Sequence, residues 1–141
     1  MIHPDLPLKA LSIRQPWAWA IINAGKNIEN RPRRFHYRGP ICIHASRYEP
    51  TAEDKRVYLE TAVAAYPNFR EFVEICRSSK GEIKGGIIGT AEIVDCIDQS
   101  DSPWFFGPYG LVLENVTPVD FIPVKGALGL FDWRKKLEAA A

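Results

Sequence analysis

Three β-rich segments follow one another in the second half of the chain, and the connections between them are too short for helical crossovers. The run Ile87 to Ile97 is rich in Ile, Val and Thr, and Gly89 within it is typical of a β-bulge. Asp101-Ser102-Pro103 marks a turn before two further strand-like segments, Gly110 to Val116 and Phe121 to Val124. Because parallel neighbours need a long crossover connection, this order predicts antiparallel pairing.

The first half of the chain mixes strands and helices. Lys9 to Arg14 alternates apolar and polar residues, as a half-buried strand does. Pro16 to Ala24 carries apolar residues at helical spacing and predicts a short, largely buried helix. Ile28 to Asn30 and Pro40 to Ser46 are predicted strands, and the polar loop Arg31 to Gly39 separates them.

Three more helices complete the predicted fold. Pro50-Thr51 is followed by acidic residues that are typical of the first turn of a helix, which we expect to run to Ala65. A second helix is predicted from Asn68 to Arg77, and a short terminal helix from Trp133 to Ala141. The elements together predict an α+β fold, a small and mostly antiparallel β-barrel flanked by helices.

The length and composition are typical of one globular domain. With 141 residues, 46% hydrophobic and 25% charged, we expect residues 1–141 to form a single domain. The three cysteines form no Cys-x-x-Cys pair, and the carboxylates show no ligand spacing, so we predict neither a metal nor another cofactor. Without a long apolar run or a signal-peptide pattern, we expect a cytoplasmic protein with no membrane partner.

Basic residues concentrate in one stretch of the chain. Between positions 14 and 38, six basic side chains stand against one acid, Glu29, so the local formal charge is +5, whereas the whole chain carries +1. Such a concentrated field attracts phosphate or nucleic acid, although a solvated arginine-rich loop would have the same composition. The six basic residues are Arg14, Lys26, Arg31, Arg33, Arg34 and Arg38.

A short motif, Gly25-Lys26-x-x-Glu29-x-Arg31, places two cations around that single acid. Gly25 suits the left-handed turn that ends a helix. Lys26 and Arg31 offer charge-assisted donors around Glu29, so we expect the three residues to hold a base, a phosphate or a sugar. Lys26 and Glu29 also provide the minimum chemistry for acid and base catalysis. The alternative is an ion-pair cluster that only stabilises the loop.

Neighbouring residues extend this predicted site. We expect Gln15 to recognise a base edge, and Trp17 either stacks on a base or packs in the core. His44 shares a strand face with Cys42 and Ser46. If this face lines the cleft, His44 acts as a general base with Ser46 as a nearby donor; otherwise His44 is a structural group.

Two aromatic segments add to the prediction. His36 lies amid Arg34, Phe35, Tyr37 and Arg38, a mixture of aromatic and basic residues suited to RNA bases and phosphates, although a flexible surface loop is the alternative. The later loop from Trp104 to Tyr109 is unusually aromatic and either closes over the cleft or plugs one end of the barrel.

Several longer motifs run through the chain, and in combination they resemble the activating signal cointegrator homology (ASCH) domain over about residues 8–133. The resemblance implies a PUA-like β-barrel with a cleft that binds RNA or modified nucleosides. The motifs are Leu11-Ser12-Ile13-Arg14-Gln15-Pro16-Trp17-Ala18, the Gly25 to Arg31 motif, Arg38-Gly39-x-Ile41-x-Ile43-His44-Ala45, Gly86-x-x-Gly89 with Glu92-x-Val94-Asp95-Cys96, and Pro123-Val124-Lys125-Gly126.

The resemblance implies several activities. Some members are RNA-binding modules, some are ribonucleases, and one bacterial branch deacylates an acetylated cytidine with a Lys followed three positions later by a Thr nucleophile. Lys26 and Arg31 match that branch, and Glu92 is a loose candidate for its downstream Glu. Glu29 stands at the Thr position, where a carboxylate cannot replace the hydroxyl, so an amidohydrolase is the least favoured activity.

We therefore expect an RNA- or nucleotide-binding protein whose partner is single-stranded RNA or a nucleotide-like small molecule. The alternative is a metal-independent ribonuclease in which Glu29 or His44 takes the 2′-hydroxyl proton and Lys26 stabilises the developing charge. The expected binding residues are Gln15, Trp17, Lys26, Glu29, Arg31, Arg33, Arg34, Arg38 and Ser46.

Overall fold

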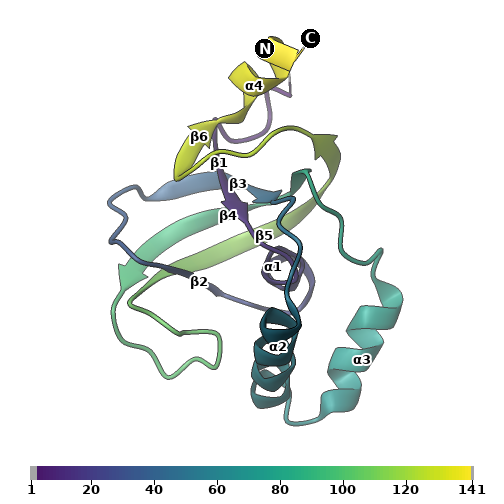
Figure 1. Ribbon diagram of the computed structural model, residues 1–141. Coiled ribbons are helices and arrows are strands. Elements are labelled where there is room, and N and C mark those ends of the chain that lie inside the picture. Colours follow the sequence, from purple (N-terminus) through teal and green to yellow (C-terminus); the bar gives the residue numbers. More distant parts are fainter. Residues whose placement is uncertain (1–2, 141) are drawn as a thin grey trace.

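The computed structural model describes residues 3–140, and within them six strands form one mixed sheet. The sheet curls into a half-barrel with the strand order β2-β5-β4-β3-β1-β6 (Figure 1). Strands β1 and β3 are parallel, and the other pairs are antiparallel, so the expected α+β barrel-like fold is confirmed. The strands are β1 (Lys9–Ile13), β2 (Ile28–Arg31), β3 (Gly39–Ala45), β4 (Gly86–Ile97), β5 (Tyr109–Pro123) and β6 (Leu130–Asp132).

Four helices in the described residues surround this sheet: α1 (Trp17–Asn23), α2 (Ala52–Ala65), α3 (Phe69–Ser78) and α4 (Trp133–Ala140). Helix α1 packs against β3 and β5, whereas α2 and α3 contact each other (Figure 1). Helix α4 lies at the opposite end of the molecule, beside the N-terminal segment (Figure 1). The four predicted helices are thus confirmed, apart from Ala141, which lies outside the described residues.

Local sequence explains where two of these helices begin. Pro16 is the N-cap of α1, one residue before the first helical residue. At the start of α2, the Thr51 hydroxyl accepts a hydrogen bond from the Asp54 backbone N–H at 3.0 Å, and the Asp54 carboxylate accepts one from the Thr51 N–H at 2.8 Å. This reciprocal capping satisfies two backbone donors that a helix start leaves free.

The apolar core has two parts on the α1 side of the sheet. The first joins α1 to the strands through buried residues such as Ile13, Ile21 and Ile43. The second joins α1 to α2 and α3 through Trp19, Tyr58, Phe72 and Trp104. A third cluster, on the opposite face of the sheet, is built around Phe131 and Trp133.

Gly89 lies where α1 approaches the sheet most closely. A Cβ atom at this position would lie 2.4 Å from the Ile22 side chain and 2.7 Å from the Thr117 carbonyl oxygen. The pairing of β4 with both β3 and β5 also shifts register beside Gly89, which confirms the predicted bulge.

Strand β5 differs from the prediction of two separate strands, because it runs unbroken from Tyr109 to Pro123. Pro118 lies between the two predicted segments, and proline lacks the N–H that a central strand needs. However, β2 pairs only with residues 109–112 of β5, so Pro118 lies on a stretch that has one neighbouring strand, β4. The three-residue strand β6 was missed because it is too short for an alternating pattern.

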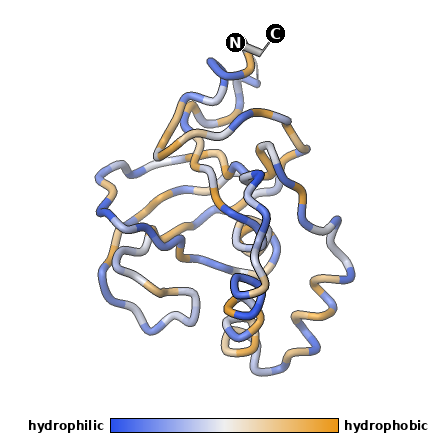
Figure 2. Tube along the Cα trace, viewed as in Figure 1, coloured by the Kyte–Doolittle hydropathy of each residue, from blue (hydrophilic) through white to orange (hydrophobic). Residues whose placement is uncertain are grey.

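The connection between β2 and β3 is one of the most hydrophilic stretches of the trace (Figure 2). It contains the predicted polar loop and ends at Gly39, the first residue of β3. Among the described residues, no helix has the length and apolar character that a membrane span requires.

Candidate functional site

A cavity of about 530 Å³ lies where the end of β1, the start of α1, strand β2 and helix α2 meet. We call it the Lys26 pocket. It brings together Lys26, Glu29, Arg31 and Trp17 of the predicted site. The other lining residues are Ser12, Ile13, Arg14, Asn30, Pro32, Asp54, Val57 and Phe106.

Lys26, Glu29 and Arg31 form one ion-pair cluster in the wall of the Lys26 pocket. Lys26 Nζ lies 3.3 Å from Glu29 Oε1, and Arg31 Nη2 donates to Glu29 Oε2 at 3.0 Å. Gly25 has the expected left-handed backbone, with φ of 70°, and directs Lys26 inward. The carboxylate therefore uses one oxygen for each cation, and the side chain of Glu29 keeps 11% of its surface exposed.

Lys26 is buried more completely than its partners, with 1% of its side-chain surface exposed. Its ammonium group donates to the Ile28 carbonyl as well as to Glu29, and lies 5.7 Å from the ring centroid of Trp17. Burial lowers the pKa of Lys26 from its ordinary value, Glu29 opposes that shift, and Arg31 adds to it. Lys26 is thus placed to hold Glu29 rather than to reach a ligand directly.

Arg31 links the ion-pair cluster to β1. Its Nη2 donates to the Ser12 carbonyl at 2.9 Å in addition to the bond to Glu29. Its Nε atom is buried and has no hydrogen-bond partner among the described residues. Since a buried N–H without a partner is costly, this donor is available for a water molecule or a ligand.

Two aromatic side chains border the Lys26 pocket. Trp17 is half-buried and makes edge contacts with Tyr58, at 5.2 Å between ring centroids, and with Phe106, at 5.8 Å. Phe106 is 53% exposed. An exposed aromatic ring beside a charged pocket provides a surface on which a base can stack.

Asn30 fixes the loop that carries Phe106. Its side-chain oxygen accepts hydrogen bonds from the backbone N–H groups of Phe106, at 2.7 Å, and Gly107, at 3.1 Å. Its Nδ2 donates to the Trp104 carbonyl at 3.0 Å. Within the aromatic loop, Trp104 is buried in the cluster that joins α1 to α2 and α3, whereas Phe106 borders the Lys26 pocket.

The Lys26 pocket also contains charged groups from the connection between β1 and α1 and from helix α2. Arg14 is exposed and its guanidinium lies 3.9 Å from the ring centroid of Tyr48. The Tyr48 hydroxyl donates to Asp54 at 2.8 Å, and Asp54 belongs to α2. Arg14 and Asp54 were absent from the predicted binding residues; the basic stretch pointed to Arg14, but no local signal linked α2 to this site.

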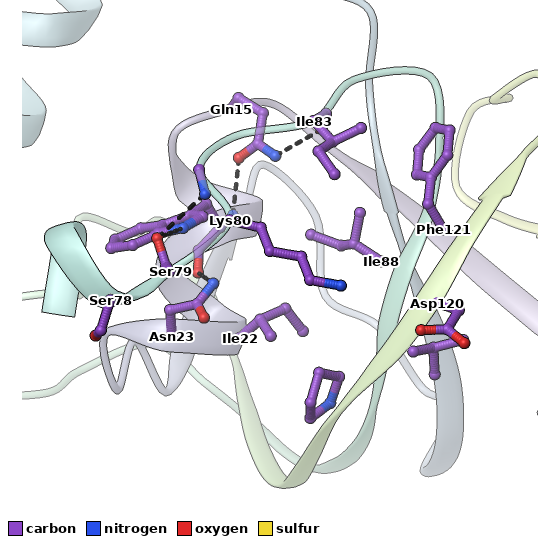
Figure 3. A pocket seen from close by; sticks show the side chains of 14 residues that line it. Gln15, Ile22, Asn23, Ser78, Ser79, Lys80, Ile83, Ile88, Asp120 and Phe121 are labelled. Atoms are coloured by element: carbon purple, nitrogen blue, oxygen red, sulfur yellow. Dashed lines mark hydrogen bonds between the residues drawn. The ribbon is translucent and has the colours of Figure 1, made fainter.

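Gln15 lies outside the Lys26 pocket. It is buried, with its oxygen accepting from the Trp19 N–H at 2.8 Å and its Nε2 donating to the Ile83 carbonyl at 2.9 Å. It lines a separate cavity of about 460 Å³, bordered by Ile88, Phe121 and the segment after α3 (Figure 3). Both polar atoms of Gln15 thus serve the fold.

The three arginines of the β2–β3 loop also lie away from the Lys26 pocket. Arg34 Nη2 lies 3.6 Å from Asp98, and the Arg34 guanidinium stacks over Tyr109. Arg38 lies 3.9 Å from Asp95, while Arg33 is exposed. Asp95 lies in β4 and Asp98 directly follows this strand, so the loop is partly neutralised by a segment that is distant in sequence.

His44 and Ser46 line a third cavity, of about 350 Å³, which we call the His44 pocket. His44 Nε2 lies 2.7 Å from the Val124 carbonyl oxygen, and Nδ1 lies 2.8 Å from Ser12 Oγ. The ring is 1% exposed. Both nitrogens are thus engaged, and His44 is not in the same cavity as Lys26, so of the two expected proton acceptors only Glu29 shares a cavity with Lys26.

Burial lowers the pKa of His44 below its ordinary value of 6.5. The hydrogen bond to the Val124 carbonyl opposes this shift, and the positive charges of Arg47 and Lys136 add to it. The imidazole is therefore neutral at pH 7.

Comparison with known proteins identifies one family. A family model described as the ASCH domain matches residues 11–125, a range that includes part of β1, all of β2 to β5 and every residue that lines the Lys26 pocket. No curated protein matches the sequence.

Proposed function

Because the chain belongs to the ASCH domain family, we propose that it binds single-stranded RNA or a nucleotide in the Lys26 pocket. The observation that carries the proposal is that Arg31 and the exposed ring of Phe106 line the same open cavity, and that the buried Nε–H of Arg31 has no hydrogen-bond partner among the described residues. A guanidinium binds phosphate through several donors, and an aromatic face stacks bases of any sequence.

The charged and aromatic residues of the pocket have different roles in this binding. Arg31 and Arg14 bind phosphate, and Phe106 and Trp17 stack on a base. Glu29 accepts hydrogen bonds from N–H groups on the base edge, because an ionised carboxylate is only an acceptor. Lys26 acts as a positioning residue, since its ammonium group is enclosed and holds Glu29.

Titration of labelled single-stranded RNA at two salt concentrations tests this function. Binding should weaken as salt rises, because each neutralised phosphate releases counterions. Phe106→Ala should weaken binding about 5- to 150-fold, from roughly 1–3 kcal/mol per stacked base. Phe121→Ala is the matched control, an exposed phenylalanine that borders the Gln15 cavity instead. Absence of binding at low salt, or an equal loss in the two variants, would overturn the proposal.

A second pair of variants tests the charged residues. Arg14→Gln removes a guanidinium that lines the Lys26 pocket, whereas Arg33→Gln removes an exposed one that does not. The slope of log affinity against log salt should become shallower by about 0.7 in Arg14→Gln alone, the value for one phosphate contact on a single strand. Inspection of the same RNA for cleavage in the presence of a chelator separates binding from the ribonuclease alternative.

A further inference from the structure

The parallel pairing of β1 with β3 places Ser12 opposite His44. Ser12 Oγ lies 2.8 Å from His44 Nδ1, and His44 Nε2 lies 2.7 Å from the Val124 carbonyl oxygen. A carbonyl only accepts hydrogen bonds, so Nε2 carries the ring proton. The unprotonated Nδ1 therefore accepts the hydrogen bond that the Ser12 hydroxyl donates.

This order of groups is that of an activated nucleophile: a hydroxyl, a base that accepts its proton, and a third group that fixes the base. The Val124 carbonyl takes the third place, and because it is a backbone group it holds the ring in one tautomer without a charge. Burial lowers the pKa of His44, which keeps Nδ1 free to accept a proton at neutral pH.

The His44 pocket gives access to this pair. Gly126 lies against both side chains: a Cβ atom there would lie 2.9 Å from Ser12 Oγ and 2.8 Å from His44 Cε1. The φ of Gly126 is not in the left-handed region, so glycine is needed here for space rather than for conformation. A side chain at position 126 would cover the hydroxyl, and its absence leaves the hydroxyl open to the cavity.

Two cations also line the His44 pocket, Arg47 and Lys125. From the hydrogen-bonded pair, the space at Gly126 and these charges, we propose that Ser12 and His44 hydrolyse an acyl ester that carries a negative charge. Ser12 borders both cavities, with its carbonyl bonded to Arg31 and its hydroxyl to His44, and the proposal does not depend on RNA binding.

The reaction balances with the ester and water as its only reactants. Ser12 Oγ bonds to the acyl carbon while its proton passes to His44 Nδ1. The ester C–O bond then breaks, and the alcohol leaves with that proton. Water attacks the acyl-serine, gives a proton to Nδ1, and the serine oxygen recovers the proton as the carboxylic acid departs.

Covalent labelling of the intact protein tests the proposal. A fluorophosphonate should add one phosphonyl group to the wild-type chain, and peptide mass mapping should place it on Ser12. Labelling should fall at least about 100-fold in His44→Gln, the lower end of what a general base contributes, and to background in Ser12→Ala. Ser100→Ala is the matched control, because Ser100 is exposed and lines neither the His44 pocket nor the Lys26 pocket, and it should label as the wild type does.

A second measurement tests the substrate class. The 4-nitrophenyl monoester of succinate, which carries a carboxylate, should release nitrophenol faster than 4-nitrophenyl acetate. Lys125→Gln should remove that difference. The absence of a label on Ser12 in the wild-type chain would overturn the proposal whatever the variants do, and a label that persists in Ser12→Ala would overturn it as well.

Discussion

Lys26 and Glu29 are a buried ion pair whose members need each other. Removing one partner from such a pair leaves an uncompensated charge, whereas replacing both with apolar side chains avoids that cost. Because Arg31 also pairs with Glu29, the carboxylate has a second cation, whereas among the described residues Lys26 forms an ion pair with Glu29 alone. Loss of Glu29 should therefore destabilise the folded protein mainly by leaving the buried charge of Lys26 without a carboxylate.

We therefore predict that Glu29→Ala lowers the free energy of unfolding by about 3–5 kcal/mol. The Lys26→Met/Glu29→Leu double variant should lose less than Glu29→Ala, because the enclosed ammonium group of Lys26 is then no longer left without a carboxylate. Urea unfolding of the wild type, Glu29→Ala and the double variant measures this, and a double variant that loses as much as Glu29→Ala or more would contradict it.

The free energy of unfolding of Glu29→Ala should also depend on pH. Burial lowers the pKa of Lys26 and Glu29 opposes that shift, so removing Glu29 lets the folded-state pKa fall further. Between this pKa and the ordinary value of 10.5, the unfolded chain binds more protons, so stability rises with pH. The difference in the free energy of unfolding between the wild type and Glu29→Ala should therefore shrink as pH rises from 7 towards 10.

His44 gives a second pH prediction, on the acid side. The pKa of His44 in the folded protein lies below the ordinary 6.5, because the ring is buried and because Arg47 and Lys136 carry positive charge. Lys125 is a further cation that lines the same pocket. As pH falls below about 6.5, the unfolded chain protonates this histidine first, so the folded state loses stability. Thermal unfolding should show a melting temperature that falls from pH 7 to pH 5, with a smaller fall in His44→Gln. An unchanged slope in that variant would assign the effect to other groups.

At the scale of elements, strand β2 does two tasks at once. Its pairing with residues 109–112 of β5 ties the start of β5 to the sheet, and its Asn30 side chain holds the aromatic loop just before β5. The same strand carries Glu29 and Arg31. The position of Phe106 relative to Arg31 therefore depends on β2 rather than on the sequence of the loop itself.

From this we predict that Asn30→Ala weakens RNA binding about as much as Phe106→Ala, and that the double variant weakens it little further. The two changes should be non-additive because Asn30 affects RNA binding by holding Phe106 in position. Binding titrations of the three proteins measure the coupling, with Asn23→Ala as the control asparagine on the surface of α1. Fully additive losses would mean that Asn30 contacts RNA itself.

At the scale of the whole molecule, the C-terminal segment closes the face of the sheet opposite α1. Trp133 is fully buried and its indole N–H donates to the Pro7 carbonyl at 2.9 Å. Arg134 donates to the Pro7 and Leu6 carbonyls as well, so α4 is held to the N-terminal segment. This packing lies beyond residue 125, where the family match ends.

We predict that Trp133→Ala lowers the free energy of unfolding by about 3–5 kcal/mol, the usual range for truncating a buried aromatic residue. Leu128→Ala is the control, because Leu128 is 99% exposed in the loop before β6. Chemical denaturation measures both. A loss for Trp133→Ala no larger than that of the control would show that the C-terminal segment is not part of the cooperative unit.

Most elements of the fold were predictable because their signals are local. Alternating residues marked β1 and β3, a run rich in Ile, Val and Thr marked β4, and proline or acidic residues marked the starts of α1 and α2. The cluster of Lys26, Glu29 and Arg31 was predictable for the same reason, since its members lie within six consecutive residues. The continuity of β5 through Pro118 was not, because it depends on where β2 stops pairing.

The sequence alone therefore determined most of the elements, the α+β class and the ion-pair cluster, all of which depend on neighbours a few positions apart. Only the tertiary structure decided which residues share a cavity. It joined Phe106 to Asn30, 76 positions away, paired Ser12 with His44, 32 positions away, and turned Arg34 and Arg38 towards acids of β4 and the turn after it. The order of strands in the sheet sets these distances, and that order follows from burying all the apolar faces together rather than from any single segment.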